Sequence, residues 1–389
     1  MQPLATLVEK AKAILAKVDD FAKANKLKWG LDKCKMMAIG KKTNILEEWQ
    51  LGNQVIGNTA SYKYLGDEIT NDGKNEKNII SRENKTNALV RKINTTASSD
   101  IMSGIESKVI LNLYEVYVIP SLLNNAESWF LTTKEEKQLD TIGIRVMKRL
   151  FNLPTTTPNV SIVYSFGLLY ITQVVDKKQF IYLHKLLTRV ELHWTHRYLK
   201  YQKSHNIAWA KQISNKLTEY DLETDWDVIK RMSPNEWKEK VRVAILKKNG
   251  QKLIENCTSM NGQEVKIHTK TKHIYEKLTN DRYKGTPIEA LVRGNKQKTR
   301  TIFLAQNGML ECGRNMKGTI PEICPECNET DDEQHRLSTC KKWSSLNSSH
   351  DTNVHFHDIY SEDKDTLNRV LSEISKIWET RFANGRMKK

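Results

Sequence analysis

Three cysteines and one histidine near the C-terminal end have the residue types and the spacing of a metal site. Two residues separate Cys324 from Cys327, and His335 and Cys340 follow within the same 17-residue stretch. Three thiolates and one imidazole are the ligand set of a closed tetrahedral zinc site. Because a full set leaves no position for water, the pattern predicts one structural Zn²⁺ rather than a catalytic one. The alternative is three ordinary buried cysteines beside an exposed histidine.

The other cysteines are scattered, at Cys34, Cys257 and Cys312. This distribution favours a metal site plus reduced thiols over a disulfide framework. No apolar run approaches the roughly 18–20 residues of a membrane span, and the first residues are typical of an amphipathic helix rather than a signal peptide. We therefore expect a nuclear or cytoplasmic protein that is not secreted and does not bind membranes.

The charge balance indicates a polyanionic partner. The 389 residues contain 62 Lys and Arg against 46 Asp and Glu, giving a net charge of +16 and a pI near 9.4. Residues 238–300 hold 16 basic and 6 acidic residues, whereas residues 322–333 hold six acids and no base. Concentrated positive charge favours RNA or DNA, because each neutralised phosphate releases counterions. The alternative is a solvated surface that only keeps the chain soluble.

Hydrophobic periodicity predicts a mainly α fold with a small antiparallel β region near the N-terminus. The expected strands cover residues 34–39, 49–56 and 62–65, followed by a turn at 71–73. Pro120 is expected to end one helix, and Pro154 and Pro158 to frame a connection. Helices are expected over residues 3–25, several segments of 76–150, 159–166, 171–190, 206–219 and about 367–378, with a basic helical linker at about 235–305.

Three segments of the first 150 residues resemble the reverse transcriptases of non-LTR (LINE-type) retrotransposons. They are Leu27-Lys28-Trp29 with Asp32-Lys33-Cys34-Lys35-Met36-Met37, then Tyr62 to Gly73, then Glu127-Ser128-Trp129. In that family the lysine-bearing turn ends the palm, the Tyr-Leu-Gly hairpin is the primer grip, helices form the thumb, and a Cys-Cys-His-Cys knuckle follows. The resemblance is intermittent over residues 1–345, and Tyr64-Leu65-Gly66 and the knuckle are its specific parts.

The sequence also departs from that family. Lys26 and Gly30 stand where the family has glycine and asparagine around the lysine turn, and Asn124-Asn125 replaces a Tyr-Gly pair. The Tyr-x-Asp-Asp hairpin that holds two Mg²⁺ ions in the family does not occur. We therefore expect no catalytic residues, no autonomous activity and no Mg²⁺ without the missing palm. Asp19-Asp20 and Asp331-Asp332 are interpreted as solvated acids.

The resemblance and the basic clusters together suggest contacts to nucleic acid. The primer-grip likeness implies a strand resting on the Tyr62 hairpin, although the tyrosines could instead pack on the next helix. Basic residues on one helix face and in the linker could follow phosphates, with Tyr275 and Tyr283 available for stacking, or could be solvated. The predicted contacts are Lys33, Lys35, Tyr62, Lys63, Tyr64, Gly66, Arg82, Lys85, Lys92, Lys270, Lys272, Arg293, Lys296, Lys298 and Arg300.

These features predict five regions and leave three hypotheses for function. The regions are an end-of-palm and primer-grip-like region at 1–75, a thumb-like domain at 76–200, a basic linker at 201–315, a zinc knuckle at 316–345 and a C-terminal helix at 346–389. The first hypothesis is a retrotransposon-derived fragment that binds RNA, DNA or an RNA–DNA duplex. The second is part of an active polymerase whose palm lies upstream or on a separate polypeptide. The third is a domesticated protein-interaction scaffold.

Overall fold

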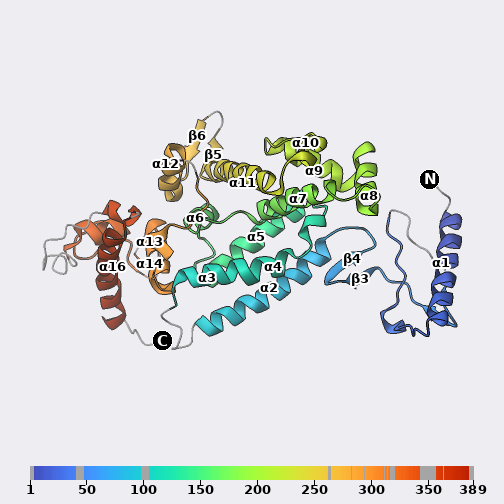
Figure 1. The fold of residues 1–389 in the computed structure, drawn as a ribbon. Coiled ribbons are helices and arrows are strands. Elements are labelled where there is room, and N and C mark those ends of the chain that lie inside the picture. Colours follow the sequence, from blue (N-terminus) through green and yellow to red (C-terminus); the bar gives the residue numbers. More distant parts are fainter. Residues whose placement is uncertain are drawn as a thin grey trace. The chain divides into compact units, whose positions relative to one another are not determined.

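The computed structural model describes residues 4–40, 48–97, 105–261, 264–281, 283–292, 294–310, 312, 314–315, 320–341, 356–361 and 363–384. Within these residues the chain is mainly helical and has three two-stranded antiparallel sheets (Figure 1). Two of the sheets lie near the N-terminus, as predicted, but the third, at residues 258–267, lies where a helical linker was expected. Internal contacts divide the chain into two units. Unit one comprises Met1–Asn84 and Trp129–Glu135, and unit two comprises Lys85–Ser128 and Glu136–Lys389.

Unit one begins with the predicted amphipathic helix, α1 (Leu4–Ala24), which packs on a β-hairpin. The hairpin pairs β1 (Trp49–Leu51) with β2 (Gln54–Ile56) around Gly52, whose φ of +61° allows the tight turn. Val8 of the helix and Trp49 of the hairpin are buried in one small core. The strand expected over residues 49–56 therefore forms as two short strands joined by the turn at Gly52.

A second hairpin in unit one pairs β3 (Ser61–Tyr64) with β4 (Asp67–Thr70). The two residues between these strands, Leu65 and Gly66, both have positive φ, as a type I′ hairpin turn requires. The strand expected at residues 34–39 does not form. Only an isolated bridge between Met36 and Asn58 occurs there, because the segment has no continuous partner strand.

Helices dominate the rest of the chain, and α2 (Glu76–Ala97) and α5 (Thr133–Leu150) contribute residues to both units. Unit two otherwise contains α6 (Asn159–Ser165), α7 (Ile171–Leu187), α8 (Trp194–Ser204), α9 (Ala208–Glu219), α10 (Trp226–Arg231), α11 (Pro234–Asn256), α12 (Lys272–Asn280), α13 (Glu289–Val292), α14 (Lys296–Gln306) and α16 (Lys364–Asn384). The helices expected at 159–166, 171–190 and 206–219 are α6, α7 and α9. No helix in the described part of the chain has the length and apolar character of a membrane span.

The prediction that Pro120 ends a helix is wrong. The backbone stays helical from α3 (Ser107–Leu113) through a π-helical turn (Tyr114–Val118) into α4 (Ile119–Leu123). Pro120 lies in the first turn of α4, where a missing backbone N–H is tolerated. The wider π-helical turn just before it accommodates the proline without ending the helix.

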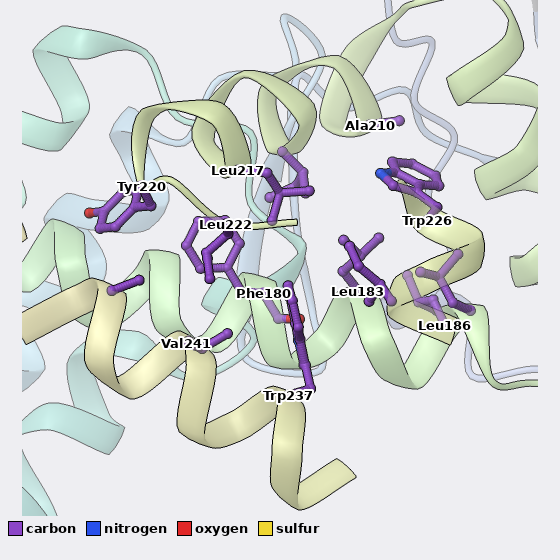
Figure 2. Close-up of a cluster of buried hydrophobic side chains, with 14 of the residues drawn as sticks. Phe180, Leu183, Leu186, Ala210, Leu217, Tyr220, Leu222, Trp226, Trp237 and Val241 are labelled. Carbon is purple, nitrogen blue, oxygen red and sulfur yellow. The ribbon is translucent and has the colours of Figure 1, made fainter. Parts of the chain in front are cut away.

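The main core of unit two includes the segment that the sequence suggested as a linker. Trp237 and Val241 of α11 are fully buried and face Phe180 and Leu183 of α7 (Figure 2). The Trp237 indole N–H donates a hydrogen bond of 2.8 Å to the Phe180 carbonyl, so this large side chain is buried without losing its polar contact. Residues 234–256 are therefore part of the folded core. A hairpin of β5 (Thr258–Asn261) and β6 (Glu264–Ile267) follows.

At position 167 of unit two, both the positive φ and the close neighbouring backbone require a glycine. Gly167 has a φ of +64°, and a Cβ there would lie 2.2 Å from the backbone carbon of Thr286. We expect Gly167→Ala to lower the free energy of unfolding by about 3 kcal/mol or more, because a backbone clash adds to left-handed strain. Gly308 has a φ of +57° with nothing within 4 Å of a Cβ, so Gly308→Ala should cost only about 1 kcal/mol. Equal losses in urea denaturation would contradict this explanation.

Candidate metal centre and predicted contact residues

The structure brings the three cysteines and the histidine into one group. The ligand atoms of Cys324, Cys327, His335 and Cys340 all lie within 4.8 Å of one another. The Cys340 Sγ lies 3.8 Å from both the Cys324 Sγ and the Cys327 Sγ. A disulfide needs sulfurs about 2.05 Å apart, so these residues are free thiols. Four converging soft and nitrogen donors form a group that could hold a metal ion.

Backbone hydrogen bonds place the four ligands. The Cys324 carbonyl accepts a 2.8 Å hydrogen bond from the Asn328 N–H, and Asn328 has a φ of +58°, which closes a tight turn around the first two cysteines. His335 begins a π-helical turn, and the Cys340 N–H donates to the His335 carbonyl across it at 2.8 Å. The Lys341 N–H points at the Cys327 Sγ at 3.2 Å. An amide directed at sulfur stabilises a thiolate.

The His335 ring has one satisfied nitrogen and one orphaned nitrogen. Nδ1 lies 2.8 Å from the Glu329 Oε2 and 3.1 Å from the Thr339 hydroxyl. Nε2 is buried and has no hydrogen-bond partner. A carboxylate that holds one ring nitrogen directs the other toward a metal. An ion bound at Nε2 would therefore satisfy the atom that the protein leaves unpaired.

The electrostatics of the group favour ionised sulfur. Burial raises the pKa of the Cys324 thiol, but the His335 ring and the backbone N–H groups of Glu326 and Cys327 outweigh it and lower that pKa to about 7. Burial also opposes the charged form of His335, yet Cys324 and Glu329 raise its net pKa above the ordinary value. The pKa of Cys324 thus shifts in the direction that prepares a thiolate ligand.

The burial of acidic residues differs from the prediction, both in the acidic loop at residues 322–333 and in α1. Asp331 was expected to be solvated, but it is buried and forms an ion pair with the buried Arg336 through two hydrogen bonds. Asp19 in α1 is also buried rather than solvated, where it pairs with Lys23 and accepts from the Trp29 indole N–H. The i,i+4 spacing on the expected helix indicates the Asp19–Lys23 pair, but spacing shows neither the Trp29 contact nor the burial of Asp331 and Arg336.

The residues predicted from the primer-grip likeness lie on and beside the β3–β4 hairpin. Lys63 and Tyr64 are exposed on the hairpin, and Gly66 is in its turn. The Tyr62 hydroxyl donates a 2.6 Å hydrogen bond to the carbonyl of Lys33, in the turn Leu31–Lys33. The structure therefore brings this turn and the hairpin together within unit one. The side chains of Lys33 and Lys35 are exposed as well.

The predicted basic face of α2 needs one correction. Arg82 is 4% exposed and forms a 2.6 Å ion pair with Asp67 of β4, so its guanidinium binds a carboxylate of the protein rather than facing solvent. Lys85 and Lys92 are exposed. Helical spacing had grouped Arg82 with the two lysines, but spacing does not reveal a buried acid on a facing strand.

The predicted basic positions beyond residue 260 fall into two groups. Lys270, Lys272 and Lys298 are exposed. Lys296 and Arg300 are half-buried and bind within the protein, to the Asn94 side chain at 3.1 Å and the Asn152 carbonyl at 2.9 Å. The predicted contact Arg293 lies outside the described residues. Tyr283 is buried and donates to the Leu168 carbonyl at 2.8 Å, so the expected role of its ring in stacking is wrong.

A cleft of about 1310 Å³ in unit two is the feature that sequence reasoning missed. It collects side chains from α5, α6, α11, β6 and α14 and from the segments beside the metal-ligating group. Its charged lining residues are Lys137, Lys252, Lys266, Lys270 and Arg314, with Asp140, Asp332 and Glu333. Only Lys270 had been predicted as a contact. The others are far apart in the sequence, and no local signal joins them.

No family model, no curated protein and no solved structure matches this chain.

Proposed function

We propose that this chain is the nucleic-acid-binding C-terminal part of a polypeptide derived from a non-LTR retrotransposon reverse transcriptase. It binds RNA or an RNA–DNA duplex through its basic surface and does not extend a primer alone. The order of features supports the derivation. A lysine-bearing turn, a Tyr-Leu-Gly hairpin, a run of helices and a Cys-Cys-His-Cys group follow one another as in that family.

The cleft of unit two carries the proposal for binding. Its lining has five basic and three acidic side chains, and the acids already have partners inside the protein. The Asp140 carboxylate accepts from the Thr172 N–H at 2.9 Å and pairs with Lys252 at 2.8 Å. The Glu333 carboxylate accepts from the Leu310 N–H at 3.0 Å. The Asp140 and Glu333 carboxylates of the cleft are thus engaged by N–H donors and a lysine of the protein.

The exposed lysines of the cleft leave a net positive field. Lys137, Lys266 and Lys270 are all exposed and reach the cleft from α5, β6 and the turn Thr269–Thr271. Each can contact one phosphate without breaking an ion pair that stabilises the fold. A concave basic lining focuses the field of a chain with a net charge of +16 and attracts polyanions.

We further propose that the metal group holds one structural Zn²⁺. Zinc binds thiolate sulfur at about 2.3 Å, and at tetrahedral angles two such sulfurs stand about 3.8 Å apart. Cys340 has that separation from both Cys324 and Cys327. With the orphaned Nε2 of His335 as the fourth donor, the ligand set is complete. Zinc would then hold the acidic loop closed beside the cleft.

Replacing Lys137, Lys266 and Lys270 together by glutamine tests the cleft. We expect the affinity for RNA and for RNA–DNA hybrid to fall, and the slope of log K against log salt to become smaller by about two to three, because each phosphate contact contributes about one to the slope. Filter binding at several salt concentrations measures both, and a primer-extension assay run alongside should show no product.

The matched control removes three exposed lysines outside the cleft, Lys211, Lys238 and Lys284. It changes the net charge by the same amount. If both triple variants lose the same slope, binding depends on diffuse charge and the cleft is not the site. If the parent chain shows a salt-independent affinity or none at all, the proposed function is wrong.

A further inference from the structure

Helix α8 carries a row of exposed rings that no predicted contact included. Trp194, Tyr198 and Tyr201 are 71%, 53% and 51% exposed, and the exposed ring of His205 follows directly after the helix. The steps of four, three and four residues place all four rings on one helix face. At about 1.5 Å per residue this aromatic row is about 16 Å long.

The opposite side of α8 anchors the helix, so the aromatic row is not needed for folding. His196, Leu199 and Gln202 are buried. Leu199 belongs to the main core of unit two, and the Gln202 Oε1 accepts from the Ala210 N–H at 3.2 Å. His196 Nδ1 lies 3.1 Å from the Leu186 carbonyl. Large rings that remain exposed on a helix already anchored by its other face are available to a ligand.

Neighbouring rings on and beside α8 contact one another. Tyr198 and Tyr201 have centroids 6.4 Å apart with planes 15° from parallel, and Tyr201 and His205 have centroids 4.1 Å apart. At the start of the row, Trp194 stacks with His193 at 6.3 Å. Rings held in a row by a helix present π-faces at low cost in conformational entropy.

The stretch of sequence that contains the row is basic. Residues 185–211 contain six lysines and arginines and one acid, Glu191. Glu191 lies 3.4 Å from Lys200 and 3.6 Å from Lys230, so lysines of the protein offset it. Arg197 is exposed and stands one turn from both Trp194 and Tyr201 on the helix. A nucleotide carries a phosphate next to its base. Arg197 could therefore bind the phosphate while a neighbouring ring stacks on the base.

We infer that the aromatic row of α8 is a stacking platform for the bases of a single-stranded nucleic acid, with Arg197 at the backbone phosphates. The inference rests on the proposed function and adds a second site to it, specific for unpaired strands. Stacking on rings tolerates any base, so the platform should bind without sequence preference. A membrane-surface helix also presents aromatic and aliphatic side chains, so binding to vesicles is measured as the competing outcome.

The test uses the full chain and fluorescein-labelled 12-nucleotide oligouridylate, with a duplex of the same length for comparison. The variant Trp194→Leu/Tyr198→Leu/Tyr201→Leu keeps apolar bulk and removes the rings. Losing one base–aromatic stack costs about 5- to 150-fold in affinity. We therefore expect the triple variant to bind the single strand at least about tenfold more weakly and the duplex within about twofold of the parent.

Two control variants keep the result interpretable. Tyr198→Phe/Tyr201→Phe retains the rings and should bind as the parent does. Val190→Ser/Leu192→Ser removes two exposed aliphatic side chains that precede the row, 74% and 85% exposed, and should have no effect. All substituted side chains are exposed, so thermal unfolding should match the parent. A 5-iodouridine label in the oligonucleotide should crosslink to Trp194, Tyr198 or Tyr201.

The outcomes separate the inference from the proposed function. Equal single-strand affinity of the parent and the leucine variant, with crosslinks elsewhere, would overturn the platform and leave the cleft proposal standing. A parent that binds neither single strand nor duplex would overturn both. If the leucine variant loses binding to vesicles of anionic phospholipid while single-strand affinity is unchanged, the row is a membrane contact and the inference is wrong.

Discussion

Chelation of the Zn²⁺ that we propose for this group, or replacement of Cys324 or Cys340 by serine, is expected to unfold residues 320–341. Structural zinc contributes roughly 10–16 kcal/mol to the folding of zinc-finger peptides, which is comparable to the roughly 5–15 kcal/mol that stabilises a whole domain. Each of the segment's other contacts contributes only about 1 kcal/mol. Its backbone turn, the His335–Glu329 contact and the buried Asp331–Arg336 pair cannot replace a bond to each of four ligands.

Two measurements check this prediction. Elemental analysis of the parent should find one zinc per chain, and the serine variants should retain less than about a tenth of it. Digestion with a protease specific for glutamate should then cut after Glu326, Glu329 or Glu333 much faster than in the parent. Cys34→Ser is the matched control, because Cys34 lies in unit one and outside the group. Protection that persists after chelation, or a parent without zinc, would refute the structural ion.

The same site should make the stability of this segment dependent on pH. The pKa of Cys324 is lowered from an ordinary value of 9.0 to about 7 in the folded chain. A depressed pKa gives stability that is fully present above the ordinary value and is lost as the pH falls through the folded value. Protons also compete with the metal for thiolates. Metal release, measured with a zinc-sensitive dye, should therefore increase as the pH falls.

The local pattern of the sequence was sufficient where structure depends on near neighbours. The spacing of Cys324, Cys327, His335 and Cys340 predicted the metal group, because its ligands lie within one short segment. The hydrophobic run over residues 49–56 predicted extended structure there for the same reason, although not its division into a hairpin. Helical periodicity located α1, α7 and α9 to within a few residues.

Prediction failed where a residue's environment comes from a distant segment. Arg82 has the spacing of a surface cation, but Asp67 on β4 makes it an internal one. The basic composition of residues 235–305 suggested a linker, yet Trp237 and its neighbours on α11 complete the core against α7. The α8 row was overlooked because alternating aromatic and basic residues do not show which helix face stays exposed.

Replacement of Lys216 by methionine is expected to lower the free energy of unfolding by about 3–5 kcal/mol. Lys216 is 9% exposed and its Nζ donates to the Glu136 Oε1 at 2.9 Å and to the Asp176 carboxylate. Burial opposes its charge, but these two carboxylates outweigh burial and raise its pKa. Methionine would leave Asp176, 5% exposed, without its cation, and an uncompensated buried charge costs about this much.

Urea denaturation followed by tryptophan fluorescence measures this loss, because Trp209, Trp226 and Trp237 belong to the core of unit two. Lys248→Met is the matched control. Lys248 pairs with Glu219 at 3.3 Å, but the Glu219 side chain is 56% exposed, so the loss should stay below about 1 kcal/mol. If Lys216→Met lowers the free energy of unfolding as little as Lys248→Met does, then water rather than Lys216 compensates the charge of Asp176.

A second substitution separates two contributions to the free energy of unfolding: the stabilisation by the intact ion pair and the cost of leaving one buried charge unpaired. Asp176→Leu added to Lys216→Met removes the stranded carboxylate, and replacing a buried pair by apolar side chains is often nearly neutral. The Tyr220 hydroxyl, which donates to Asp176 at 2.7 Å, then loses its acceptor and retains a cost of about 1–3 kcal/mol. We therefore expect the double variant to be more stable than Lys216→Met alone. A double variant that is the sum of two large losses would mean that the ion pair itself, rather than the avoidance of a lone charge, stabilises this core.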